Sequence, residues 1–131
     1  MIYILDNIAA ILAATVVGAA VGLVWLRVSG RGVGPGGVLA AMLGLFWLAA
    51  ILAGALILAP VDAGGWTIAL GTPVIIWGGF LLPGFAATLP ALGHGWRTVV
   101  SASAVWLVAM LAMAAVLHAI GLNAPIASPA G

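Results

Sequence analysis

Hydrophobic side chains fill four long runs of the chain, which short stretches of glycine, proline and charged residues separate. The runs cover about residues 3–25, 37–59, 66–89 and 98–120. A helix needs roughly 20 apolar residues to cross the hydrocarbon core of a bilayer, and each run has about that length. An unpaired backbone amide in lipid costs several kcal/mol, and the alternating strands of a barrel are missing from the pattern. Each run is therefore expected to be a helix.

The connectors contain residues that end helices. The first is the glycine-rich segment RVSGRGVGPGG, the second is PVDAGGW, which begins at Pro60, and the third follows Pro90. Connectors of roughly 6 to 10 residues suit antiparallel neighbours. The pattern predicts a single all-α integral membrane domain over residues 1–131, an up-down-up-down four-helix bundle. The tail at 121–131 is expected to be flexible.

Composition excludes a soluble domain. Hydrophobic residues make up 66% of the 131 residues and charged residues 4%, against about 45–50% and about 25% in soluble domains. A domain this short leaves much of its chain at the surface, which must then be wettable. The absence of cysteine excludes disulfides, thiolate catalysis and cysteine-ligated clusters. A net charge of +1 is too small to attract nucleic acid, so no such partner is expected.

The basic and acidic residues fall on opposite sides of the predicted membrane. With four crossings, the first and third connectors share one side of the membrane, and they contain Arg27, Arg31 and Arg97. Asp6 and Asp62 fall on the other side. The positive-inside rule then predicts that both termini lie on the non-cytoplasmic side of a bacterial cytoplasmic membrane. Since no basic residue precedes Arg27, residues 3–25 are expected to remain as a span and not to be a cleaved leader.

Small residues recur every four positions in the first two spans. Helices in lipid associate where small residues let two backbones approach closely. The expected helix-packing residues are Ala10, Ala14, Gly18, Gly22, Ala40, Gly44, Ala50 and Gly54. They are expected to pack either helices of this chain or a face that meets a second copy or a partner.

The third span is interrupted. Pro73 and Pro83 each remove a backbone donor, and Gly78 and Gly79 lie between them. A kinked or partly unwound helix is expected. One interpretation is a kink alone, and the other is a broken helix that exposes backbone groups to a transported substrate.

Aromatic and basic side chains mark the predicted ends of the spans. Tryptophan and arginine at headgroup depth are typical membrane anchors, and Arg97 is also placed to contact anionic lipid. The expected interface anchors are Trp25, Arg27, Arg31, Trp66, Trp96 and Arg97.

His118 is the main candidate for a polar or ligand site, because it lies near the outer end of an apolar helix. It is interpreted as an interfacial histidine that bonds Asp62, Asp6 or water, as one axial ligand of a haem or pigment, or as part of a proton relay. His94 is expected at the opposite face, so the two histidines cannot share a metal. No metal site is predicted.

Three segments carry a family resemblance. The segment VGLVWLR closes the first span, and WGGFLLP and GHGWRTVV follow in the third span and the start of the fourth. With these segments the chain resembles the small four-helix membrane proteins of the domain-of-unknown-function family 1761. The resemblance implies a helical bundle and implies no activity.

No nucleophile–base pair, paired carboxylates or phosphate loop occurs in the sequence, so a non-enzymatic role is predicted. The favoured function is an accessory or structural subunit that packs against other transmembrane helices, in a homo-oligomer or a larger membrane complex. The alternatives are a small transporter or channel protomer and a pigment- or haem-binding subunit. Membrane lipid is the expected ligand, and no cofactor is predicted.

Overall fold

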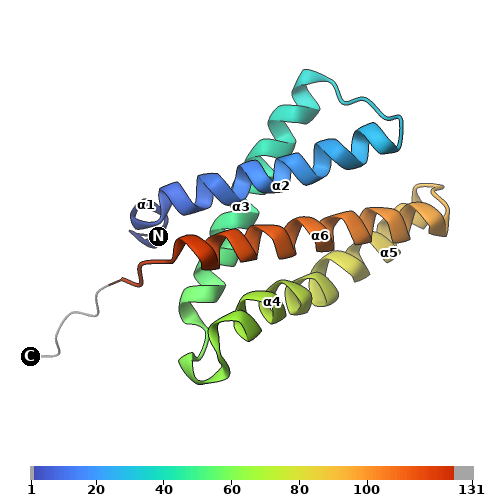
Figure 1. The fold of residues 1–131 in the computed structure, drawn as a ribbon. Helices are drawn as coiled ribbons and strands as arrows, with labels where there is room; N and C mark the ends of the chain where they lie inside the picture. The colour runs from blue at the N-terminus through green and yellow to red at the C-terminus, as the bar shows by residue number, and fades with distance from the viewer. Residues whose placement is uncertain (1, 126–131) are drawn as a thin grey trace, which may run out of the picture.

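The computed structural model describes residues 2–125, which form a bundle of helices joined by short connectors (Figure 1). Four helices are long and apolar enough to cross a membrane, as the sequence predicts. The third of them is continuous from Gly65 to Ala91 but contains a π-helical turn. The elements in chain order are α1 (Ile2–Asp6), α2 (Ile8–Val28), α3 (Pro35–Leu58), η1 (Val61–Ala63), α4 (Gly65–Ile76), η2 (Trp77–Leu81), α5 (Leu82–Ala91) and α6 (Trp96–Ile120).

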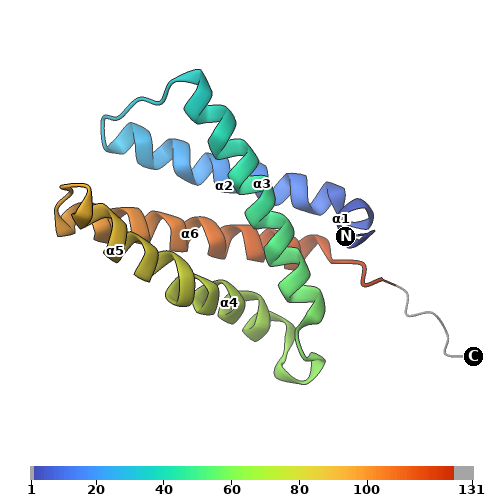
Figure 2. The ribbon, with the colours of Figure 1, turned by 180° about the vertical axis from the view of Figure 1, so that it is seen from behind.

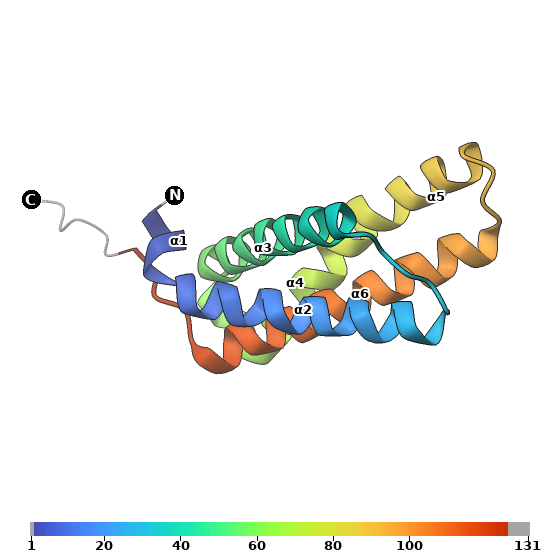
Figure 3. The same ribbon diagram turned by 90° about the horizontal axis from the view of Figure 1, so that it is seen from above.

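Helix α6 is the centre of the arrangement. It lies between α2 on one side and α4 with α5 on the other, and runs antiparallel to all three (Figure 1). Helix α3 crosses one face of this layer obliquely, as the view from behind and the view from above both show (Figures 2 and 3). The α3–α4 connector lies at the same end as both described chain ends, and the two other connectors lie at the opposite end (Figure 1).

The ends of the first span differ from the predicted limits. A break at Asn7 separates α1 from α2, so the long helix begins at Ile8. Asparagine favours such breaks because its side chain competes for backbone hydrogen bonds, and here its Nδ2 donates to the Tyr3 carbonyl at 2.8 Å. The helix then continues to Val28, beyond the predicted end at Trp25.

The two connectors at the arginine-rich end close their helices in the same way. After α2, Gly30 has a φ of 65°, and the Arg31 amide donates to the Leu26 carbonyl at 3.0 Å. After α5, Gly93 has a φ of 84°, and the His94 amide donates to the Leu89 carbonyl at 2.9 Å. Both are Schellman motifs, which need a residue in the left-handed region. Glycine therefore ends the first and third spans.

Helices α2, α3 and α6 meet at Gly18. A Cβ atom placed there would lie 2.7 Å from Met113 Sδ and 3.1 Å from Leu45 Cδ2, closer than ordinary contact. Ala10, Ala14 and Gly18 are all buried along α2. Because lipid tails are as apolar as leucine, this close backbone approach stabilises the crossing more than hydrophobic burial does.

The other predicted packing residues divide into two groups. Ala50 is buried, and Gly54 lies beside the ring of Tyr3. By contrast, Ala40 and Gly44 are exposed, and a Cβ atom on Gly22 or Gly44 would meet no atom within 4 Å. Gly22 faces the space that opens where α2 and α3 diverge beyond Gly18 (Figures 1 and 2), and Ala40 and Gly44 lie on the side of α3 that faces away from α2, so these positions pack against nothing within the described chain.

The irregularity in the third span is a π turn and not an unwound segment. The Leu82 amide donates to the Trp77 carbonyl, five residues earlier. Such a turn inserts one residue into the helix. It lies immediately before Pro83, whose ring would clash with the carbonyl one turn back in a regular α-helix. Trp77 Nε1 also donates to the Ser103 carbonyl at 2.7 Å, which ties the π turn to α6.

The contact at Gly18 generates the first prediction. Replacing Gly18 with Leu should destabilise the folded protein by about 1–3 kcal/mol, because the new side chain has no room beside Met113 and Leu45. The matched control is Gly22→Leu, the same substitution one turn along α2 at a position without close neighbours. The free energy of unfolding in detergent is measured for both variants. An equal loss of stability would show that Gly18 is not a packing contact.

Candidate functional site

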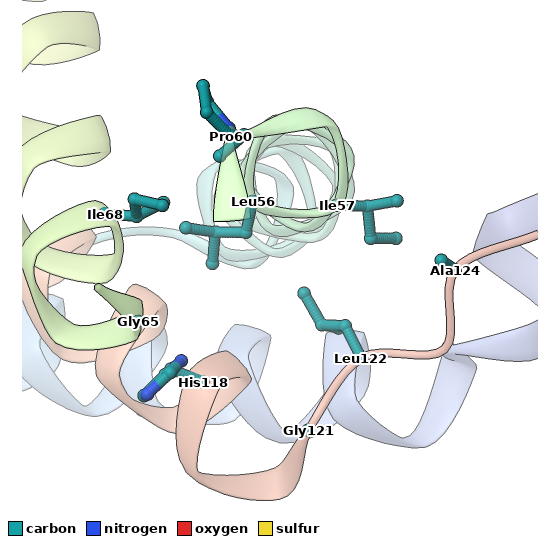
Figure 4. Close-up of a pocket in the computed structure, with 10 residues that line it drawn as sticks. Leu56, Ile57, Pro60, Gly65, Ile68, His118, Gly121, Leu122 and Ala124 are labelled. Carbon is teal, nitrogen blue, oxygen red and sulfur yellow. The ribbon is translucent and has the colours of Figure 1, made fainter. Parts of the chain in front are cut away.

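A cavity of about 410 Å³ opens at the end of the bundle that holds both described chain ends. Its walls are the end of α3, the start of α4, the end of α6 and the segment that follows α6 (Figure 4). Among the described residues that line it, His118 alone has a polar side chain. The cavity is thus an apolar recess with one imidazole at its edge.

Glycine at position 65 sets the position of His118. A Cβ atom on Gly65 would lie 2.6 Å from His118 Cε1, so any other residue there would displace the ring. The imidazole also packs edge-on against Trp66, with ring centroids 4.5 Å apart and planes at 68°. Edge-to-face packing of this kind is favourable for aromatic rings. The half-buried His118 side chain is therefore held by the first turn of α4.

The polar residues predicted near His118 do not gather around it. Among residues 2–125, no hydrogen bond joins His118 to Asp62 or Asp6, and both carboxylates are exposed. His94 lies in the connector between α5 and α6, at the opposite end of the bundle. Within the described residues, no three histidine or carboxylate side chains lie close enough to hold a metal ion. The arrangement offers one imidazole that can donate or accept a single hydrogen bond from each nitrogen.

A polar contact that the sequence analysis missed holds one wall of the cavity. Asn7 is 3% exposed. Its Nδ2 donates to the Asn123 carbonyl at 2.9 Å, and its Oδ1 accepts from the Asn123 amide at 2.6 Å. Together with the bond to Tyr3, these contacts satisfy the whole amide group. The two neighbours of Asn123, Leu122 and Ala124, line the cavity.

The same contact involves the first residues of the tail that was predicted to be flexible. Asn7 bonds the backbone of Asn123, and Leu122 packs against the core. Gly121, with a φ of 87°, ends α6 and directs the chain toward Asn7. The predicted flexibility of residues 126–131 lies outside the described residues. In the sequence, Asn7 stands beside Asp6 in the apolar segment LDNIAAIL, and nothing there indicates its partner at position 123.

Helix α1 packs across the end of α3. The Tyr3 hydroxyl donates to the Ala50 carbonyl at 3.2 Å, and a Cβ atom on Gly54 would lie 3.1 Å from that hydroxyl. The small residues Ala50 and Gly54 therefore make room for a tyrosine from α1. This contact and the Asn7 contact join the start of the chain to the bundle.

The arginine-rich end differs in character. The guanidinium of Arg31 lies 5.6 Å from the centre of the Trp25 ring, a cation–π contact. Arg27, Arg31 and Arg97 are all exposed. Trp96 is exposed at this end and Trp66 at the other, which are the positions expected of interface anchors.

The chain matches no protein-family model, no curated protein and no solved structure. Function is therefore inferred from the geometry and the chemistry of its residues.

The contact between Asn7 and Asn123 generates the second prediction. Replacing Asn7 with Ala should cost about 1–3 kcal/mol, because it leaves the backbone groups of Asn123 without their partners. Amide hydrogen exchange at residues 121–125 should become faster. Asn123→Ala is the control, since the bonds use only the backbone of that residue. If both variants exchange alike, or neither differs from the original, Asn7 does not hold the segment.

Proposed function

We propose that the chain is a non-enzymatic membrane subunit that packs α3 against another transmembrane helix, in a homo-oligomer or a larger membrane complex. The observation that carries the proposal is the exposure of the first half of α3. Every residue from 35 to 44 is exposed, whereas the second half of α3 contributes Leu45, Ala49, Leu52 and others to the core. This exposed first half, residues 35–44, is called the α3 arm.

The α3 arm has a face of small residues that points away from α2. At about 100° per residue, positions 40, 44, 47 and 51 fall on one side of α3, and positions 38, 41, 42 and 45 fall on the other. The first side contains Ala40 and Gly44, followed by Trp47 and Ile51 beyond the arm, and all four are exposed. Close backbone approach at such residues is what associates helices in lipid. A second helix therefore fits against this face.

The buried polar groups support a structural role. Asn7, Thr15 and Ser103 are the buried polar residues of the described chain. Thr15 donates to the Ile11 carbonyl at 2.7 Å, and Ser103 donates to the Val99 carbonyl at 2.6 Å. All three side chains are occupied by backbone hydrogen bonds. Their hydrogen bonds therefore serve the packing of the helices, which supports the proposed structural role.

The π turn gives less support to a transport role. Gly78, Gly79 and Phe80 are exposed on the outside of the single chain. A broken helix in a transporter instead places its free backbone groups around a site between helices.

Helix packing by the α3 arm generates the third prediction. Replacing Gly44 with Leu should weaken assembly about tenfold or more, because the new side chain separates the two backbones by more than a methyl group. The control is Gly84→Leu on α5, where an exposed glycine also has no neighbour within 4 Å. Native mass spectrometry from mild detergent measures the assembled mass. The proposal would be contradicted if the unsubstituted chain is monomeric, or if both variants assemble equally well.

For the orientation, we propose that the arginine-rich end faces the cytoplasm of a bacterial cell and that both termini lie outside. The support is that all three basic residues, Arg27, Arg31 and Arg97, belong to the same end of the bundle.

Cysteine labelling tests this orientation, since the chain contains no cysteine of its own. In intact cells, a membrane-impermeant maleimide should label Ala63→Cys and should leave Gly95→Cys unlabelled until the membrane is opened. Both positions are exposed and lie in different connectors at opposite ends. The reverse labelling would place the termini in the cytoplasm.

A further inference from the structure

The divergence of α2 and α3 leaves a wedge-shaped space that the chain itself does not fill. The two helices touch where Gly18 meets Leu45 and separate toward the arginine-rich end (Figures 1 and 2). Two cavities occupy this space, of about 200 Å³ and about 140 Å³. Both are lined by Gly22, Leu26 and Ala41, with Leu45 at their inner end. These two adjoining cavities are called the α2–α3 wedge.

The wedge is apolar and as deep as one leaflet. Its walls in α2 run from Gly18 to Leu26, which is about 12 Å of helix. Half of a hydrocarbon core of about 30 Å is about 15 Å. Trp106 of α6 lines one of the two cavities, and Val33, in the connector at the outer end, lines the other. Every residue that lines the two cavities is glycine or hydrophobic.

Positive charge lies at the mouth of the wedge. Arg27 is in the last turn of α2, one residue after the wedge residue Leu26 and about 100° further round the helix, and the Arg31 guanidinium lies over Trp25, another wedge residue. The carboxylates of the described chain, Asp6 and Asp62, lie at the other end of the bundle. Within residues 2–125, the two guanidinium groups therefore have no carboxylate nearby to neutralise them.

We infer that the α2–α3 wedge binds an anionic phospholipid, with one acyl chain between the helices and the phosphate at Arg27 and Arg31. The charge at the mouth selects an anionic headgroup, because arginine pairs well with phosphate oxygens. The apolar lining and the length of about 12 Å suit an acyl chain, which lies along one leaflet of the bilayer.

This lipid site is independent of the proposed assembly through the α3 arm. Ala41, Met42 and Leu45 face the wedge, whereas Ala40 and Gly44 lie on the opposite side of α3. A substitution on one face therefore leaves the other face unchanged.

The test places the full chain in nanodiscs of equimolar phosphatidylglycerol and phosphatidylcholine and counts retained lipids by native mass spectrometry after gentle detergent release. The original chain should retain phosphatidylglycerol in preference to phosphatidylcholine. Removing both arginines, in Arg27→Ala with Arg31→Ala, should reduce this preference about 20-fold or more, at about fivefold per charge. Arg97→Ala, at the same end, should change the preference less, because neither of its neighbours Trp96 and Thr98 lines the wedge.

A second variant tests the acyl-chain part of the site. Gly22→Leu should remove retained lipid of both kinds, since its side chain would occupy the space that both cavities share. Gly84→Leu is the control outside the wedge and should retain lipid as the original does. The paired arginine variant alters only exposed side chains, so it tests the headgroup part of the site independently of Gly22→Leu.

Three outcomes would overturn the inference. The first is equal retention of the two lipids by the original chain. The second is unchanged retention by Gly22→Leu. The third is a change in assembled mass by Gly22→Leu with no loss of lipid, which would identify a second copy of the chain as the occupant of the wedge.

Discussion

The close approach of three helices at Gly18 determines most of the arrangement. In lipid, apolar side chains gain little by leaving the solvent, so packing distance decides how helices associate. Because Gly18 has no side chain, Met113 of α6 and Leu45 of α3 both reach the backbone of α2 at the same level. The point of contact lies near the middle of both α2 and α3. The oblique crossing there makes the ends of α3 diverge from α2, and the exposed arm and the wedge follow from that divergence.

Hydrogen bonds from side chains to backbone carbonyls add to this packing at the irregular places. Tyr3 bonds Ala50, Asn7 bonds Asn123, and Trp77 bonds Ser103. Each bond starts beside an interruption in a helix: the break at Asn7 or the π turn at Trp77. A carbonyl in a membrane helix that accepts a second bond does not lose its own helical bond, because oxygen has two lone pairs. The interruptions are thus joined to neighbouring helices without weakening them.

The four spans and their alternation could be predicted from the sequence, because length and apolarity alone decide which segments cross a bilayer. The packing could not be predicted to the same extent. Gly18 and Gly44 belong to the same kind of small-residue spacing, yet one is buried and the other exposed. Gly18 lies on the side of α2 that meets α3 and α6, whereas Gly44 lies on the side of α3 that faces away from α2, and a repeat every four residues does not encode which side of a helix meets its neighbour.

The candidate site was harder to predict for a different reason. The sequence indicated His118, and its expected partners were Asp62, Asp6 or water, whereas the structure places it against Trp66 and Gly65. The lack of room for a side chain at position 65 becomes apparent only when the start of α4 and the end of α6 are brought together. The Asn7–Asn123 contact joins residues 116 positions apart, so no local pattern signals it. Long-range polar pairs of this kind depend on the tertiary fold and not on local periodicity.

The two ends of the bundle differ in how firmly the chain holds them. At the aspartate end, Tyr3 and Asn7 bond α1, α3 and the segment after α6 into one unit. At the arginine end, α2 and α3 separate and are joined by a connector with glycine at positions 30, 32 and 34. Segments with few buried contacts open most easily and are the usual places for binding. The unfilled apolar volume and the unneutralised arginines occur together at this looser end, where an external molecule can supply the contacts that the chain lacks.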